Sequence, residues 1–227
     1  MIQIPMISPW NVCTPTLFRY LKSDYVDAFF SDGSLRLSSF ALFKQHEDEQ
    51  RLDKTEGETL LSVETQRPEP RLLFSRGYYG LNAYVLSTTI WHDEDLMEAF
   101  ECDSYIRIND ATEFGMRVAR HVPSLIAGFE GLCLYQDKKI IARSVDHMDT
   151  TQFFDPTDPS RPNRELLERF TRDEMKHYPF FLKHKSYLHQ GEYRLLWMTS
   201  ARVEGFLDIK VPEAIPFCSR PRSFTDP

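Results

Sequence analysis

Short apolar segments with a period of two recur along the chain and predict strands. They are rich in alternating apolar, β-branched and aromatic residues, and the clearest are 17–21 (LFRYL), 35–40 (LRLSSF), 84–89 (YVLSTT), 105–108 (YIRI), 193–198 and 206–211. With weaker candidates they amount to about seven short strands. Strands predominate at both ends of the chain, and helix signals fall between them.

Three helix starts are marked by residues that cap a first turn. Ser23 or Asp24 precedes an apolar stripe that Gly33 ends, and Asp93 precedes a second stripe. Asp110 with Glu113 resembles a capping box. Together with weaker signals, these predict about three to five helices.

Three stretches between these elements predict less regular structure. The charged and proline-containing segment at about 45–70 is expected to be a long excursion from the core. Segments 131–135 and 139–142 suggest a hairpin around Gln136-Asp137-Lys138, and the proline-rich stretch 155–163 suggests a loop before a helix near 166–170.

The strands do not alternate strictly with helices, so the sequence favours an α+β fold with a mixed or antiparallel sheet. No G-x-G-x-x-G follows a strand, and no G-x-x-x-x-G-K-[ST] occurs, so neither a Rossmann dinucleotide site nor a P-loop is predicted. We interpret residues 1–227 as a single domain, because this length supplies one sizeable core.

Composition indicates a cytoplasmic protein without a membrane partner. The first ten residues, MIQIPMISPW, have no basic region and contain two prolines, and no apolar run approaches the ~20 residues of a membrane span. The four cysteines are scattered without a C-x-x-C pair, which is typical of reduced thiols.

The net charge of −7 argues mildly against a general polyanion-binding protein. It leaves room for a local basic groove, and the stretch 161–185 holds seven Lys and Arg residues. Acidic residues are interleaved among them, so we interpret this stretch as a solvated helix face rather than a groove.

Four features in chain order carry the candidate chemistry. Arg19 is a cation within an otherwise apolar strand, and the passage 26–40 turns on Gly33 into a strand that ends with Ser38 and Ser39. Ser87-Thr88-Thr89 places hydroxyls on both faces of a strand. Gln190-Gly191-Glu192 leads into the strand at 193–198, with Gln190 and Glu192 on one side if that backbone is already extended. Taken singly, each has an ordinary structural explanation, and for Glu192 this is a surface carboxylate paired with Arg194 or Lys185.

Together, these features resemble the R-S-E group of ADP-ribosyltransferases, which carry an Arg on the first strand, an S-T-S-like middle strand and a [QE]-x-E before a late strand. The order FRYL, GSLRLSSF, YVLSTT, YIRI and FLKHKSYLHQGEYRLLW is also similar to a poorly characterised bacterial family that ends in K-x-x-x-W-x-x-E-x-E-Y-R. Tyr187 stands where that family has Trp, and Gln190 stands where it often has Glu.

The resemblance implies an ADP-ribosyltransferase-like fold with NAD as the substrate that is consumed. Glu192 would be the catalytic carboxylate and Gln190 would address the acceptor. Arg19 would bind a phosphate of NAD, and Ser87 or Thr89 would orient Glu192 and the dinucleotide by hydrogen bonding. Tyr20 and Ser38 would also contribute to the NAD site, and Ser38 or Ser39 is the alternative to Ser87 as the middle serine.

The resemblance also implies a toxin of a toxin–antitoxin or phage-defence system, with an antitoxin protein as partner. The acceptor would be a nucleic-acid base, in RNA or DNA, or a protein side chain. Two other readings stay open: a non-catalytic domain that binds a nucleotide or a partner protein, and simple hydrolysis of NAD. No metal is expected, because consecutive residues such as those at 46–49 and 92–95 cannot all point at one ion.

Overall fold

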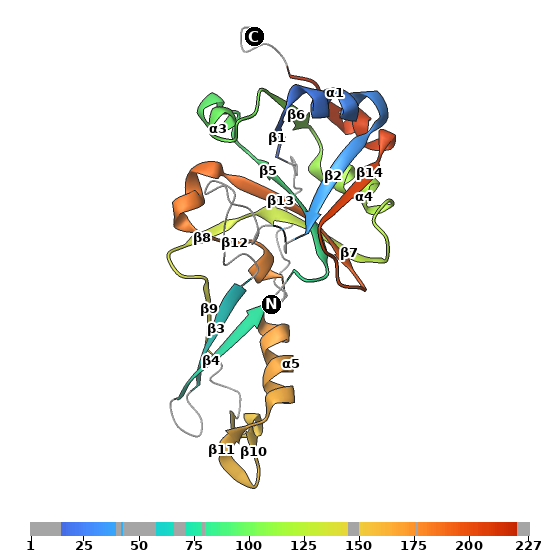
Figure 1. Cartoon of the computed structure of the whole chain (residues 1–227). Coiled ribbons are helices and arrows are strands. Elements are labelled where there is room, and N and C mark those ends of the chain that lie inside the picture. Colours follow the sequence, from blue (N-terminus) through green and yellow to red (C-terminus); the bar gives the residue numbers. More distant parts are fainter. Residues whose placement is uncertain are drawn as a thin grey trace, which may run out of the picture.

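A computed structural model describes residues 15–39, 42, 58–65, 71–78, 80–144, 150–175 and 177–221. Its central feature is a curled antiparallel sheet of eight strands in the order β14-β2-β5-β1-β6-β15, with β13 pairing with both β5 and β7 (Figure 1). The strands are β1 (Leu17–Leu21), β2 (Ser34–Ser39), β5 (Ala83–Thr89), β6 (Ser104–Ile108), β7 (Leu125–Leu132), β13 (Glu192–Thr199), β14 (Phe206–Lys210) and β15 (Cys218–Ser219). The α+β class and the antiparallel sheet predicted from the sequence are confirmed.

The helices are short and lie between the strands: α1 (Ser23–Asp32), α3 (Glu94–Ala99), α4 (Ala111–Ala119) and α5 (Arg164–Met175). Four 3-10 helices add single turns: η1 (Thr150–Phe153), η2 (Tyr178–Phe180), η3 (Lys185–Gln190) and η4 (Pro212–Phe217). Within the described ranges, no helix has the length and apolar character needed to cross a bilayer.

The predicted caps of α3 and α4 are confirmed, and that of α1 is wrong. The carboxylates of Asp93 and Asp110 accept hydrogen bonds from backbone N–H groups three residues on, at 3.2 and 3.0 Å. In α1 the N-cap position is Lys22, and the N–H of Ser23 donates to Asp103 at 2.7 Å. A carboxylate 80 residues away in the chain therefore replaces the expected local cap.

A second, separate and smaller sheet lies below the main one in Figure 1. It has the order β4-β3-β9, formed by β3 (Glu58–Thr65), β4 (Arg71–Tyr78) and β9 (Ile140–Ser144). Helix α5 lies beside it, and the short hairpin of β10 (Phe154–Asp155) and β11 (Asp158–Pro162) lies at the tip. This part has its own apolar cluster, which includes Leu61, Phe153 and Met175.

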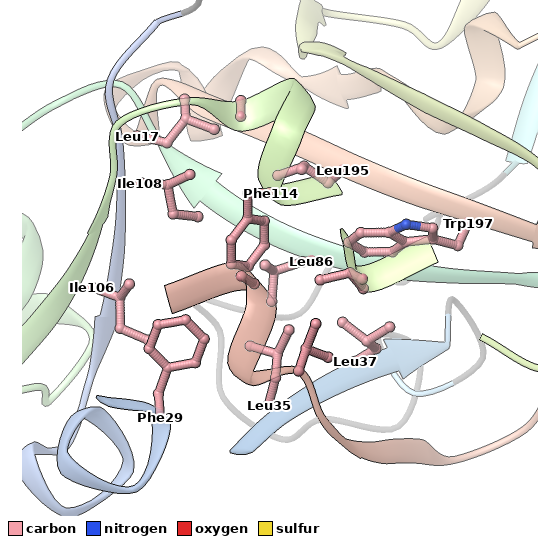
Figure 2. Packing of buried hydrophobic residues seen from close by; sticks show 14 of the residues in the cluster. Leu17, Phe29, Leu35, Leu37, Leu86, Ile106, Ile108, Phe114, Leu195 and Trp197 are labelled. Carbon is pink, nitrogen blue, oxygen red and sulfur yellow. The ribbon is translucent and has the colours of Figure 1, made fainter. Parts of the chain in front are cut away.

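The main core lies between the large sheet and helices α1, α4 and η4. Val26 and Phe29 of α1 and Phe114 and Val118 of α4 pack against it, with Trp197 of β13 fully enclosed. Figure 2 shows Phe29, Phe114 and Trp197 converging with other core side chains from strands and helices far apart in sequence. The remaining labelled members of the cluster are Leu17, Leu35, Leu37, Leu86, Ile106, Ile108 and Leu195.

Three predictions about the irregular stretches need correction. Segments 131–135 and 139–142 do not pair as a hairpin: β8 (Leu134–Gln136) pairs in parallel with β12 (Leu182–His184), and β9 pairs in parallel with β3. The expected loop at 155–163 contains the β10–β11 hairpin, and the excursion at about 45–70 contains β3. In each case the backbone N–H and C=O groups bond to a distant strand or across a tight turn, and local propensity does not predict such partners. The rest of the excursion lies outside the described residues, and the single domain over 1–227 stays a prediction.

Candidate functional site

The main sheet divides along one edge of β5, and the candidate site lies where it divides. One edge of β5 pairs with β13 along its whole length. The other edge pairs with β2 only at Val85 and Tyr84, and with β1 only at Thr89. Between these contacts, the Arg19 guanidinium donates through Nη1 to the backbone oxygen of Ser87 at 2.7 Å. A side chain of β1 thus satisfies a carbonyl that strand pairing leaves open.

A pocket of about 750 Å³ opens at this division, within the usual range for ligand sites. Strands β1, β2, β5, β6, β12, β13 and β14 line it together with α1 and η3. Every site residue expected from the sequence lines this one pocket: Arg19, Tyr20, Ser38, Ser87, Thr89, Gln190 and Glu192. Ser39, the further alternative for the middle serine, is fully buried and is not among the lining residues.

The pocket face of β5 and β13 changes from apolar to polar along the strands. Cross-strand pairs place Ala83 opposite Met198 and Val85 opposite Leu196, and these side chains pack in an apolar cluster. The next pairs on the same face, since side chains alternate, are Ser87 with Arg194 and Thr89 with Glu192. The polar end of this face coincides with the pocket.

Glu192 is a buried carboxylate held by two cations. Its side chain is 6 % exposed, and the whole residue is 5 % exposed. Arg194 Nε donates to Oε1 at 2.7 Å and Lys183 Nζ donates to Oε2. The interpretation of Glu192 as a surface carboxylate is therefore wrong. Its pairing with Lys185 is wrong as well, because Lys185 pairs with Asp137. Burial alone would raise the pKa of the Glu192 carboxyl, but the charges of Arg194 and Lys183 outweigh it and hold that pKa well below its ordinary value.

Gln190 and Glu192 lie close together, but not because of strand alternation. Gln190 ends the 3-10 helix η3, and Gly191 follows in the left-handed region with φ 49°. Their side chains meet at Lys183, whose Nζ donates to Gln190 Oε1 at 2.7 Å as well as to Glu192. The expectation of an extended backbone at Gln190 is corrected by this turn.

The hydroxyl groups of Thr89 and Tyr20 bond to groups other than Glu192, the partner expected for Thr89. Thr89 Oγ1 accepts from the N–H of Trp91 at 3.0 Å, and Tyr20 Oη donates to the Trp91 carbonyl at 2.9 Å. Ser87 Oγ is buried and has no hydrogen-bond partner among the described residues. The predicted hydrogen bond that orients Glu192 is therefore made by Lys183 and Arg194 and not by a hydroxyl. Ser87 Oγ retains its hydrogen-bonding capacity for a ligand.

Lys183 is the site residue that sequence reasoning missed. It was placed on a solvated helix face with the other cations of 161–185, and the exposed Arg164, Arg169 and Arg172 of α5 fit that interpretation. Lys183 instead lies on β12 and is 8 % exposed. Its place within the apolar run FFLKH was the available signal, because a lysine is almost never buried unless it is paired.

The pocket is rich in positive charge although the chain as a whole is acidic. Its lining holds six basic and three acidic side chains: Arg19, Lys22, Arg36, Lys183, Arg194 and Lys210 against Glu101, Glu192 and Asp208. Some of these charges pair with one another, as Arg36 does with Asp208 in a bidentate arrangement at 2.6 and 2.8 Å. The surplus suits an anionic ligand such as a pyrophosphate.

For a metal ion, the described part of the chain offers no cluster of three or more His, Cys, Asp or Glu side chains. Of the two stretches weighed as ligands, 92–95 forms the start of α3 with Asp93 as its cap. The other, 46–49, lies outside the described residues.

The sequence matches no protein-family model, and neither the curated proteins nor the solved structures gave a match. The candidate site is therefore defined by its own geometry: a carboxylate between two cations, an arginine of β1 that bonds to the open edge of β5, and a serine hydroxyl without a partner in the described part of the chain.

Proposed function

We propose that this protein is an NAD-dependent ADP-ribosyltransferase with an ADP-ribosyltransferase-like fold. One observation carries the proposal: the seven residues that the family resemblance implies for the site, spread from position 19 to position 192, line a single pocket. Three features support a dinucleotide as the ligand: the volume of that pocket, its surplus of basic side chains, and the Ser87 hydroxyl, which none of the described residues bonds.

In the proposed reaction, the bond between the nicotinamide nitrogen and ribose C1 breaks heterolytically. The electron pair leaves with nicotinamide, positive charge develops on the ribose, and an acceptor nucleophile attacks C1 and releases its proton. A fixed carboxylate next to the developing charge lowers the barrier electrostatically, as in glycoside hydrolysis. The acceptor would be a nucleic-acid base or a protein side chain.

Glu192 would act through its charge rather than as a base. Because its pKa is held below the ordinary value, the carboxylate stays ionised at neutral pH but takes up a proton poorly. Arg19 would bind a phosphate while keeping its contact with the Ser87 carbonyl, and Gln190 would address the acceptor. Tyr20, Ser38 and Thr89 would shape the walls of the pocket.

The biological role that we propose is that of a cytoplasmic toxin in a toxin–antitoxin or phage-defence system, restrained by an antitoxin protein. This part rests on the family resemblance of GSLRLSSF and HQGEYRLLW. The charged segment at about 45–70 is the proposed antitoxin-docking region.

A second candidate, a non-catalytic domain that binds an anionic nucleotide, is favoured by one contact pattern. Both carboxylate oxygens of Glu192 already accept hydrogen bonds from cations. In such a domain the carboxylate would hold Lys183 and Arg194 in place, and the basic side chains would bind the ligand without chemistry.

The test is to express the wild type, Glu192→Gln and the exposed control Glu204→Gln in bacteria. Growth and transfer of label from NAD to RNA, DNA and protein are measured, and circular dichroism checks folding. A transferase predicts toxicity and labelling in the wild type and the control, with labelling by Glu192→Gln lower by about 100-fold or more. A folded wild type that binds NAD but never cleaves it supports the binding domain and refutes the transferase.

A further inference from the structure

Lys183 reaches the pocket from a strand that is also packed in the smaller part of the molecule. Strand β12 pairs in parallel with β8, with Lys183 beside Tyr135. Successive side chains of a strand point to opposite sides. Leu182 packs in the cluster of the smaller part, while Lys183 lines the pocket. The lysine is thus fixed at its Cα by packing that lies outside the pocket.

The ammonium group of Lys183 is surrounded by residues of one short segment. Nζ donates to Gln190 Oε1 at 2.7 Å and to Glu192 Oε2, and it lies 4.7 Å from the ring centroid of Tyr187. The distance to Tyr187 is that of a cation–π contact. One cation therefore contacts three side chains of η3 and β13 and joins them across the turn at Gly191.

These contacts determine how both functional groups face the pocket. An ammonium only donates hydrogen bonds, so the group of Gln190 that faces Lys183 must be its amide oxygen, and the NH₂ group points elsewhere. For Glu192, Lys183 holds one oxygen and Arg194 holds the other, which fixes the plane of the carboxylate. Without Lys183, the amide of Gln190 would lose one of its contacts, and one carboxylate oxygen of Glu192 would lose its cation.

We propose that Lys183 is a positioning residue that holds the ribose-binding carboxylate and the acceptor-addressing amide in one fixed relation. This inference rests on the proposed function and extends it: Lys183 sets the partition of NAD between transfer to the acceptor and hydrolysis by water. When the Glu192 carboxylate and the Gln190 amide are less well fixed, water can reach the position from which the acceptor should attack. The rate of transfer therefore falls more than the rate of NAD cleavage.

The first test compares Lys183→Met, Lys183→Arg and the exposed control Lys185→Met. Nicotinamide release and label transfer to the acceptor are measured over a range of NAD concentrations up to saturation. Lys183→Met should lower kcat for transfer by about 10- to 100-fold and raise the fraction of NAD hydrolysed, with KM for NAD little changed. Lys183→Arg, which keeps the charge, should recover part of the transfer, and Lys185→Met should behave as the wild type. Should Lys183→Met not fold, Lys183→Arg alone must still shift the partition.

A double mutant separates positioning from a general loss of stability. In a Gln190→Ala background, Lys183→Met should change the partition between transfer and hydrolysis less than it does in the wild type, because the amide it orients is gone and only its contact with Glu192 remains. An undiminished effect in that background, or an unchanged partition in folded Lys183→Met, overturns the inference while leaving the transferase in place.

An NMR titration gives a readout that does not need activity. The carboxylate signal of Glu192 should titrate at higher pH in Lys183→Met than in the wild type, because one of its two cations is removed. If the wild type neither cleaves NAD nor labels any acceptor, the proposed function fails. An unchanged Glu192 titration refutes the positioning of Glu192 independently of that result.

Discussion

Alanine at position 191 should destabilise the protein strongly, because Gly191 lies against an indole ring and has a left-handed backbone. Its φ is 49°, and a Cβ built there would lie 2.1 Å from Trp91 Nε1 and 2.3 Å from Trp91 Cδ1. The Gly191 carbonyl also accepts from the N–H of Ile90 at 3.1 Å. The turn between Gln190 and Glu192 is thereby tied to the loop that follows β5, and neither side can move freely.

Gly205 provides a matched control for the size of this effect. It too has a positive φ, of 70°, but a Cβ there would meet nothing within 4 Å. Both alanines carry the left-handed penalty of about 1–2 kcal/mol. Both also gain from a less flexible unfolded chain, and this gain cancels in the comparison. Gly191→Ala should therefore cost about 1–3 kcal/mol more than Gly205→Ala, the usual penalty of overpacking.

Urea denaturation followed by far-ultraviolet circular dichroism measures both changes in the free energy of unfolding. Removing the indole with Trp91→Ala should relieve the clash, so in that background the two alanines should cost nearly the same. Equal losses for Gly191→Ala and Gly205→Ala in the presence of Trp91 would refute the reasoning. A difference that persists without the indole would refute it as well.

Three further predictions concern charge, core and cap. Glu192→Gln should lower the free energy of unfolding at pH 7 by about 3–5 kcal/mol in urea denaturation, because two buried cations lose their carboxylate. The pKa of Glu192 is lowered from 4.5, so its ion pairs stabilise the wild type above that pH. The free energy of unfolding should therefore fall as the pH drops below 4.5. A wild type as stable at pH 3 as at pH 7 would contradict this. Leu37→Ala, at a fully buried position, should cost about 2–5 kcal/mol by the same assay, and a similar loss for Leu132→Ala, which is 48 % exposed, would be contrary to the packing argument. Asp93→Ala should cost about 1 kcal/mol and speed amide exchange in the first turn of α3, whereas unchanged exchange would show that the cap does not hold this turn.

Local pattern was sufficient for three strands that line the pocket and for helices α3 and α4. The strands at 17–21, 84–89 and 193–198 carry enough β-branched and aromatic side chains to be recognised in isolation, and the structure places β1, β5 and β13 there. The same holds for α3 and α4, since an N-cap contact spans only three residues.

Pairing over long distances was not accessible from local pattern. Strand β3 pairs with β9, with Leu60 opposite Ile140, and β8 pairs with β12, with Leu134 opposite Leu182. Both pairs are parallel, and a parallel partner is reached through a long connection that leaves no turn signal between the strands. The prediction of a hairpin near 131–142 was wrong because adjacency in sequence was the only guide.

The sequence by itself determined which chemical groups are available and on which strands Arg19, Ser87 and Glu192 lie. Only the tertiary structure decided that β1 and β2 diverge from β5, so that these groups line one pocket. It also decided that Lys183, rather than Lys185, faces the carboxylate, because pairing with β8 sets the orientation of β12. Which side chains are buried depends on which surfaces of the folded chain pack together. The local sequence around a charged residue is the same whether that residue is solvated or paired with another charge in the interior.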